Sequence, residues 1–416
     1  MSVVQRPSVF KIELHDNNDP SRPSAPLVYY PGSTIAGNVV IHSMQVMKPL
    51  HQMKIQLIGK AHVNWQDRIA VRVGNRIDSI PAICTDVETT LELAVELWDV
   101  AGNRTTADGA PRQLIGLPAG EHKFPFRIDL PASLDHKLPS SYEQPIPKGY
   151  IRYVLTAGIS QTALFQFDHS TSLSISISGS IDVNIPKLLH PLSRSQQEKQ
   201  RFYKSSLHVL NVKTDRCGYC PGESIAITVE TENLKTATKL HDRDQPPIKA
   251  NLKQTICFCG KPFHRNGKAV TNAVYDSKSI EMTNIIQTVE GPGNWHNKLL
   301  PIPLIPPTIA KCRILKVSYV LEVVMKLKGP LGGRVLRTEL PIIIGTIPYR
   351  GPEGSSVPTP DDPTDIDFIR NNNIVYERVM KLLTLQDSKS KQISLTFTPN
   401  YGVVHNYQYA PSDQSN

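Results

Sequence analysis

The stretch LVYYPGSTIAGNVVI (residues 27–41) recurs later in the chain as GYCPGESIAITVE (residues 218–230). Proline fixes φ and glycine tolerates a positive φ, so the Pro-Gly pair in each copy predicts a tight turn. After the turn, apolar and small polar residues alternate and β-branched residues are frequent, which is typical of a strand. The tyrosine, proline, glycine and isoleucine of the first copy all return 190 residues later. The chain therefore encodes the same turn and strand twice.

A second pair of segments extends the repeat. IRYVLTAGI (151–159) resembles VSYVLEVVM (317–325), and a proline-bounded apolar strand precedes each. Alternate residues from Ile151 to Ile159 share one face of a strand. Two matched pairs in the same order indicate a duplicated unit of roughly 150–180 residues, too long for a solenoid repeat. We predict an all-β chain of two tandem, immunoglobulin-like antiparallel β-sandwiches, followed by a partly disordered C-terminal tail.

The predicted domain boundaries follow changes in composition. We expect sandwiches over residues 8–184 and 205–350, joined by a linker at 185–204, where strand patterning gives way to polar and charged residues. The tail, 351–416, opens with a proline- and acid-rich linker. Residues 366–385 could form one helix, although three consecutive asparagines disfavour it. Its apolar stripe would be Phe368, Val375, Val379 and Leu382.

Length and composition indicate a folded protein of two domains. The chain has 416 residues, of which 39% are hydrophobic and 20% charged. No run of eighteen apolar residues occurs, so no membrane-spanning helix is predicted. The first residues lack the apolar core of a signal peptide, and we expect a cytoplasmic location. Six cysteines in such a chain favour free thiols over a disulfide framework.

The net charge of +9 is unevenly distributed. From Gly351 onward five Lys and Arg stand against eight Asp and Glu, so the body before this point is more basic than the whole chain. A basic body suits an acidic partner, such as a phosphorylated protein or an anionic lipid surface. The alternative is a solvated basic surface with no partner.

The order of several phrases points to a known family. The first half contains YYPGSTIAGNVVI, MKIQLIGKAHVNW and LPAGEHKFPFRIDLPASL, and the second contains GYCPGESIAITVETEN, PPTIAKCRILKVSYVLEV and PIIIGTIP. With these phrases, residues 8–350 resemble the arrestin superfamily, and within it the arrestin-domain-containing proteins, or α-arrestins.

The resemblance implies two hinged arrestin-type sandwiches with no active site and no cofactor. It implies a cytosolic trafficking adaptor that binds cytoplasmic regions of membrane-protein cargo, such as receptors and transporters. Such adaptors bring HECT-type ubiquitin ligases, adaptins or clathrin to that cargo, at the plasma membrane and endosomes. No nucleic-acid partner is expected.

The chain departs from the family pattern at two places. Neither Pro246-Pro247 nor Pro306-Pro307 begins a Pro-Pro-x-Tyr motif, and the nearest tail sequence is Thr398-Pro399-Asn400-Tyr401. Losing the first proline weakens docking in a WW groove. Where receptor arrestins sense phosphate with an arginine, this chain has His169, which is not a fixed cation at pH 7. The alternatives are a phosphate-sensing signalling arrestin and a retromer-like coat scaffold subunit.

The tail also carries two sorting-signal patterns and a competing interpretation. Tyr401-Gly402-Val403-Val404 fits a Tyr-x-x-apolar signal, and Leu382-Leu383-Thr384-Leu385 approaches a clathrin box. Alternatively, residues 391–404 form an extended strand that docks on a sandwich edge and covers it. The partner-binding candidates are Pro399, Tyr401, Val404, Leu382, Leu383 and Leu385.

Four cysteines suggest a possible zinc site. Cys217, Cys220, Cys257 and Cys259 could supply four thiolates, but the second pair has one intervening residue, unlike a zinc ribbon. Buried or surface thiols are the alternative. No Gly-rich phosphate loop, H-E-x-x-H motif or Gly-x-Ser-x-Gly elbow occurs, and an enzyme is not expected.

Overall fold

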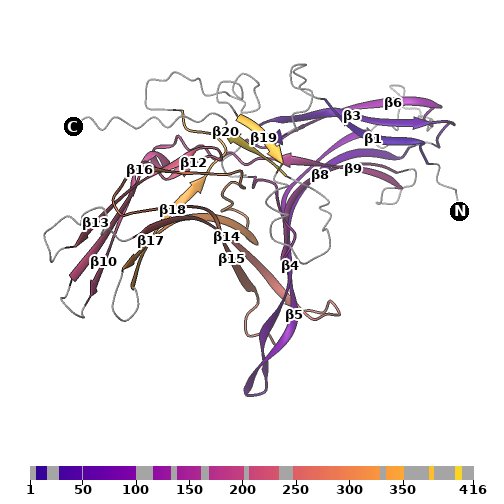
Figure 1. The fold of residues 1–416 in the computed structure, drawn as a ribbon. Coiled ribbons are helices and arrows are strands. Elements are labelled where there is room, and N and C mark those ends of the chain that lie inside the picture. Colours follow the sequence, from indigo (N-terminus) through magenta and orange to yellow (C-terminus); the bar gives the residue numbers. More distant parts are fainter. Residues whose placement is uncertain are drawn as a thin grey trace. The chain divides into compact units, whose positions relative to one another are not determined.

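In the residues that it describes, a computed structural model shows strands and one short helix. It describes residues 6–15, 28–48, 50–99, 116–132, 138–160, 168–200, 206–233, 247–327, 334–350, 374–378 and 399–404. Two compact units are present (Figure 1). Unit 1 comprises Met1–His62, Val87–Gly179 and Lys391–Pro399, and unit 2 comprises Val63–Asp86, Ser180–Ser390 and Asn400–Asn416.

Unit 1 is a sandwich of two sheets. One sheet has the order β1-β3-β6, and the other contains β5, β4, β8, β9 and β2 in that order, with β7 paired to β8. The strands are β1 (Val9–Leu14), β2 (Val28–Tyr29), β3 (Thr34–Ser43), β4 (Gln52–Val73), β5 (Arg76–Asp99), β6 (Gly120–Asp129), β7 (Tyr142–Gln144), β8 (Lys148–Ser160) and β9 (His169–Ile177). Alternate residues of β3 and β8 are buried, as a half-covered antiparallel sheet requires.

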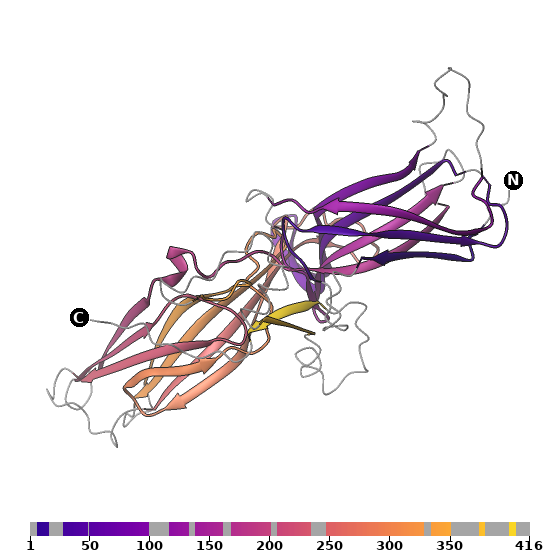
Figure 2. The ribbon, with the colours of Figure 1, turned by 90° about the horizontal axis from the view of Figure 1, so that it is seen from above.

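Unit 2 repeats this plan (Figure 2). One sheet has the order β10-β11-β13-β16, and the other contains β12, β18, β17 and β14, with β15 paired to β14. Its elements are α1 (Pro186–Leu189), β10 (Leu192–Gln200), β11 (Ser206–Thr214), β12 (Gly218–Tyr219), β13 (Ser224–Asn233), β14 (Ile248–Phe263), β15 (Lys278–Gly291), β16 (Trp295–Pro301), β17 (Leu315–Leu327), β18 (Arg334–Ile344), β19 (Ile374–Arg378) and β20 (Asn400–Val404).

The two copies of the repeated turn adopt the same structure. The short strand before each turn pairs in parallel with a late strand of its own unit, β2 with β9 and β12 with β18. Each turn then places its glycine at a positive φ, 88° at Gly32 and 91° at Gly222. An L-residue with a side chain rarely adopts this conformation, which explains the repeated glycine.

The second pair of repeated segments supplies matching core residues. Tyr153 and Tyr319 are both almost completely buried. The Tyr153 hydroxyl donates a hydrogen bond to the Pro139 carbonyl (2.7 Å), and the Tyr319 hydroxyl donates to the Pro306 carbonyl (2.6 Å). A buried phenol needs such a partner. The predicted all-β fold of two tandem sandwiches is confirmed.

Two of the predicted boundaries differ from the structure. The expected linker 185–204 contains α1 and β10, and β10 pairs antiparallel with β11 from Leu192 to Gln200. Most of β10 is exposed, and an edge strand of this kind carries polar residues without a buried apolar face. Within residues 8–184, Val63–Asp86 belongs to unit 2, and Ile83–Thr85 of β5 pairs with Lys261–Phe263 of β14.

The helix predicted over residues 366–385 is wrong where the structure describes this segment. Ile374–Arg378 is a strand, β19, which pairs antiparallel with β20. Its first three residues, Ile374, Val375 and Tyr376, have high strand propensity, and a partner strand outweighs a weak helical stripe. The remaining residues of 366–385 lie outside the described ranges.

Candidate functional site

The repeated turn of unit 2 joins β12 to β13 through Cys220, Pro221, Gly222 and Glu223. The Glu223 N–H donates to the Cys220 carbonyl (3.1 Å), and the Gly222 N–H donates to the Ile302 carbonyl (2.9 Å). The Glu223 carboxylate accepts a second bond, from the Cys220 N–H (2.9 Å). The turn is therefore fixed from both sides, and the Pro221 carbonyl is left for a further partner.

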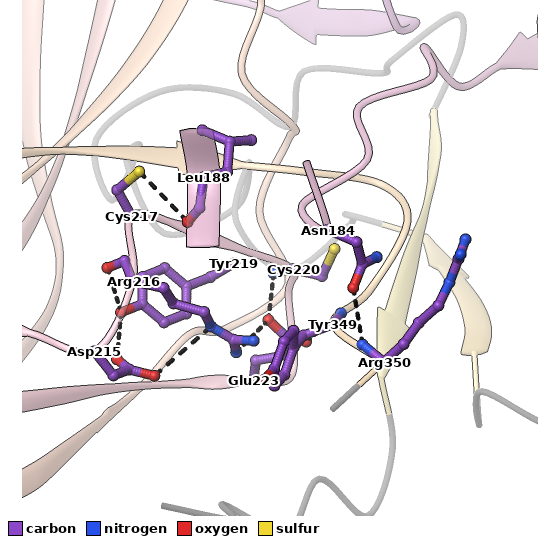
Figure 3. A network of polar contacts seen from close by, with 10 residues as sticks. All are labelled: Asn184, Leu188, Asp215, Arg216, Cys217, Tyr219, Cys220, Glu223, Tyr349 and Arg350. Atoms are coloured by element: carbon purple, nitrogen blue, oxygen red, sulfur yellow. Dashed lines mark hydrogen bonds and ion pairs between the residues drawn. The ribbon is translucent and has the colours of Figure 1, made fainter. Parts of the chain in front are cut away.

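A buried ion pair lies beneath this turn (Figure 3). The Arg216 Nη2 is 3.0 Å from the Glu223 Oε2, and their side chains are 4% and 1% exposed. The guanidinium lies over the rings of Tyr219 and Tyr349, 4.7 and 4.2 Å from their centroids. Burial raises the pKa of Glu223, against the effect of Arg216 and of two backbone N–H groups. Each charge is costly to bury without the other, so the pair locks the turn.

The same turn also holds the chain that follows β18. The Tyr349 N–H donates to the Glu223 Oε1 (3.0 Å). One residue on, the Arg350 N–H donates to the Asn184 Oδ1 (Figure 3). The Asn184 side chain also donates to the Pro348 carbonyl. The residues before β10 and those after β18 are thus joined at one place.

The tail strand β20 docks on this turn. The Val404 N–H donates to the Pro221 carbonyl (2.9 Å), and Tyr401 is 3% exposed. A β-carbon on Gly222 would lie 2.1 Å from the Val404 carbonyl oxygen, so the close approach requires glycine. On its other side β20 pairs with β19, from Ile374↔Val404 to Arg378↔Asn400. The site is therefore a turn that holds an extended segment by its backbone.

Three of the predicted partner-binding residues lie in or beside this docked strand. Pro399 and Tyr401 are buried, and Val404 is half-buried. Asn400–Val404 is extended, as the alternative expected, but it pairs with β19 in a two-stranded sheet and not with a sandwich edge. Residues 391–398 are outside the described ranges. A partner that reads Tyr-x-x-apolar must take the tyrosine side chain into its own pocket. In this arrangement Tyr401 is not accessible to such a partner.

The other candidates are placed as follows. Leu382, Leu383 and Leu385 lie outside the described residues. His169, at the position compared with the phosphate-sensing arginine, is the first residue of β9 and stands opposite Ile159.

The four zinc candidates do not form one site. Cys217 and Cys220 are buried near the turn, and burial raises the pKa of both thiols. Cys257 and Cys259 lie two residues apart on β14 and are half-buried. In the described parts of the chain, no three His, Cys, Asp or Glu side chains are grouped so that they could hold a metal ion. All six cysteines are in described ranges, and none forms a disulfide.

Sequence reasoning missed the Arg216–Glu223 pair and its partner Tyr349. Comparison of the two copies of the turn could have indicated the ion pair. Ser33 occupies the position of Glu223 in the first turn, where its hydroxyl contacts only the backbone of Tyr30 among the contacts described. A serine replaced by a glutamate on a buried turn requires a cation nearby, and Arg216 is seven residues upstream.

Unit 1 contains a separate charged cluster around Tyr150. The Arg152 guanidinium lies 4.0 Å from the Tyr150 ring centroid, and the His62 ring lies 5.1 Å from it. Arg152 also forms an ion pair with Glu143. Burial, together with Lys148 and Arg152, lowers the pKa of His62.

The fold is that of an all-β protein with two tandem sandwiches, in which the same turn occurs twice and a strand from the tail contacts the second turn. The described residues contain no group of side chains that could hold a metal ion. Comparison with known families gives the class a name. Residues 23–184 match the model of the arrestin (or S-antigen) N-terminal domain, and residues 204–349 match that of the C-terminal domain.

Individual relatives agree with these matches. The chain is 30% identical over 329 residues to arrestin domain-containing protein 4 of Mus musculus, covering 78% of this chain and 70% of the relative. It is 28% identical over 325 residues to the Homo sapiens protein of that name, covering 78% and 69%. It is also 28% identical over 332 residues to arrestin domain-containing protein 17 of Caenorhabditis elegans, covering 77% and 68%. The chain belongs to the arrestin family and is similar to its arrestin domain-containing members.

The described residues include no helix that is long and apolar enough to cross a bilayer.

Proposed function

We propose that the chain is a non-catalytic adaptor that binds cytoplasmic regions of membrane proteins and couples them to sorting machinery. Its cargo would be receptors or transporters, and the machinery adaptins, clathrin or HECT-type ubiquitin ligases. It would act in the cytoplasm, peripherally at the plasma membrane and endosomes, where anionic lipid is a further partner. The resemblance to arrestin domain-containing proteins over most of the chain carries this proposal.

The docked tail strand supports separate binding roles for the body and the tail. The body supplies two sandwiches with exposed strand edges, and an edge can take an extended peptide by backbone pairing. The tail supplies Tyr401, which is buried while β20 is docked. An adaptor of this kind would bind cargo through the body and expose its tyrosine segment to machinery after β20 leaves the Pro221–Gly222 turn.

A capture experiment from detergent-solubilised membranes tests the proposal. The baits are the full chain, a chain ending at Arg350, and an unrelated β-sandwich protein as control. We expect integral membrane proteins on both chains, and adaptins, clathrin or ligases on the full chain alone. If neither bait retains more membrane proteins than the control, the adaptor proposal is wrong.

Repeating the capture with a phosphatase-treated extract distinguishes this function from that of a phosphate-sensing arrestin. His169 stands where the resemblance places a sensing arginine, so capture is expected to survive phosphatase treatment of the extract. Loss of cargo after that treatment would favour a phosphate-sensing arrestin.

A further inference from the structure

We propose that the end of the β4–β5 hairpin is a membrane-contact element for anionic lipid bilayers. This inference rests on the proposed action of the chain at membranes, and it assigns the membrane contact to particular residues. The hairpin turns at Gly74-Asn75, with Gly74 at a φ of 61°, as a two-residue turn with glycine allows. Every residue from Arg72 to Ser79 is exposed.

The end of the hairpin exposes two large apolar side chains. Val73 is 52% exposed and Ile77 is 68% exposed, and they flank the turn on β4 and β5. Further back on β4, Ile69 and Val71 are buried. The alternation of apolar residues along β4 therefore continues beyond Val71, the last residue that the rest of the protein buries.

Each of these apolar residues directly follows an exposed arginine in the sequence, and Asp78 follows Ile77. Among the described residues, neither Arg72 nor Arg76 forms an ion pair, whereas Lys278, behind them, pairs with Asp67 at 2.8 Å. Residues 67–78 and 264–278 together contain six Lys and Arg against three Asp and Glu. An arginine next to an exposed apolar residue suits the level of lipid phosphates, where each basic residue adds to the attraction.

The hairpin is held rigidly behind its free end. Val71 pairs with Ala273, the Arg72 N–H donates to the Asn272 carbonyl (2.8 Å), and the Val274 N–H donates to the Ala70 carbonyl (2.9 Å). These bonds lie within unit 2 and stop just before the turn. Figure 1 shows the ends of β4 and β5 joined at this free turn. Little conformational entropy is lost when such a rigid end enters an interface.

A bilayer fits this element better than a folded protein partner does. A specific protein interface takes about 800 Å² from each partner and a complementary surface. A two-stranded end with two apolar side chains is narrow and offers neither. A lipid interface needs no concavity, and it accepts apolar side chains beside cations.

Vesicle sedimentation with the full chain tests this assignment. The probes are vesicles of phosphatidylcholine alone and vesicles with 30% phosphatidylserine, at about 0.1 M salt, where screening is moderate. We compare the wild type with the double variant Val73→Ser/Ile77→Ser and with Arg72→Gln/Arg76→Gln. The matched control is Ile285→Ser/Val335→Ser, because these residues are 57% and 51% exposed on other strands of unit 2.

We expect the wild type to partition onto the anionic vesicles and weakly onto the neutral ones. The serine pair should lose about tenfold in partition, from burial of apolar side chains, and the glutamine pair about fivefold per arginine. The control should stay within about twofold of wild type, as for residues outside the contact. In the variant Ile77→Trp, tryptophan emission should shift to shorter wavelength on anionic vesicles.

Wild-type partition that is equal on both vesicles, or equal between wild type and the serine pair, overturns the proposal. So does an unchanged emission of Ile77→Trp. Capture of membrane proteins from detergent contains no bilayer, so it is expected to be unaffected by the serine pair. If vesicle binding fails while capture persists, this inference alone falls.

Discussion

The carbonyl oxygen of Val404 lies 2.1 Å from the position of an ideal β-carbon on Gly222. In the first copy of the turn, a β-carbon on Gly32 would instead meet the Ala132 side chain at 3.3 Å. Both glycines need a positive φ, but the turn of unit 2 also leaves room for a strand that arrives from the tail. This second requirement distinguishes the two copies.

Replacing Gly222 should therefore release β20. In Gly222→Ala the strained φ destabilises unit 2 by about 1–3 kcal/mol, and the β-carbon excludes Val404. We expect faster proteolysis and faster amide exchange at Tyr401. Gly267→Ala is the control, since its φ is 80° but nothing lies within 4 Å of its β-carbon. Equal exchange at Tyr401 in the two variants would refute the steric account.

The same variant should change recognition of the tyrosine segment. A motif that is accessible in a small fraction of molecules binds with an apparent affinity reduced by that fraction. If the Tyr-x-x-apolar motif is a sorting signal, an adaptin subunit should bind Gly222→Ala about tenfold more tightly than wild type. Tyr401→Ala in the Gly222→Ala background should abolish the gain. Binding that is as tight to wild type would mean that docking does not mask the motif.

Breaking the buried ion pair should be costly. Arg216→Met leaves the Glu223 carboxylate buried without its cation, and we expect a loss of about 3–5 kcal/mol in the free energy of unfolding. Arg334→Met is the control, because the Arg334–Glu198 pair is exposed and its loss should cost less than about 1 kcal/mol. Similar losses in denaturant unfolding of both variants would contradict the assigned role of burial.

The duplicated tyrosines should have similar energetic roles. Tyr153→Phe leaves the half-buried Pro139 carbonyl without its donor. Tyr319→Phe does the same to the buried Pro306 carbonyl and also removes the acceptor of the Gln254 amide. Each variant should destabilise its unit by about 1–3 kcal/mol. Tyr275 is 73% exposed, so Tyr275→Phe should have little effect. Thermal unfolding of the three variants measures this. An unchanged melting temperature for one of the two core variants would show that the two tyrosines do not have similar energetic roles.

Mild acid should destabilise unit 1 through His62. Its pKa is lowered in the folded state by burial, Lys148 and Arg152, so the unfolded chain binds the proton more readily. The contribution of neutral His62 to the free energy of unfolding is therefore fully present above the pKa of the unfolded chain, about 6.5. It is lost as the pH decreases toward the lower pKa of the folded state. His62→Gln should reduce the loss of melting temperature between pH 7 and 5. An unchanged pH dependence would count against this account.

The sequence was sufficient for the fold where the signals are local. The turn glycines and the alternation of apolar residues along a strand involve neighbours in the sequence, and the segments around Tyr153 and Tyr319 repeat such a local pattern. β10 was missed because an exposed edge strand needs no apolar pattern. β19 was missed because its strand conformation depends on β20, which is distant in sequence.

The candidate site was predictable only in part. The extended conformation of the tyrosine segment could be anticipated from the alternation before it, but not its pairing with β19 in place of a sandwich edge. Its position could not, because the turn at Pro221–Gly222 shows no sequence complementarity to β20, and the contact uses backbone atoms. The Arg216–Glu223 pair likewise depends on burial by Tyr349, 126 residues after Glu223.

Proximity labelling in living cells tests the adaptor account most directly. The labelling enzyme is fused to the full chain, and in parallel to a chain ending at Arg350 and to an inert cytoplasmic protein. The account predicts that both chains label integral membrane proteins on their cytoplasmic segments, with sorting or ubiquitination machinery added for the full chain. A labelled set that matches the inert protein for both chains would contradict it.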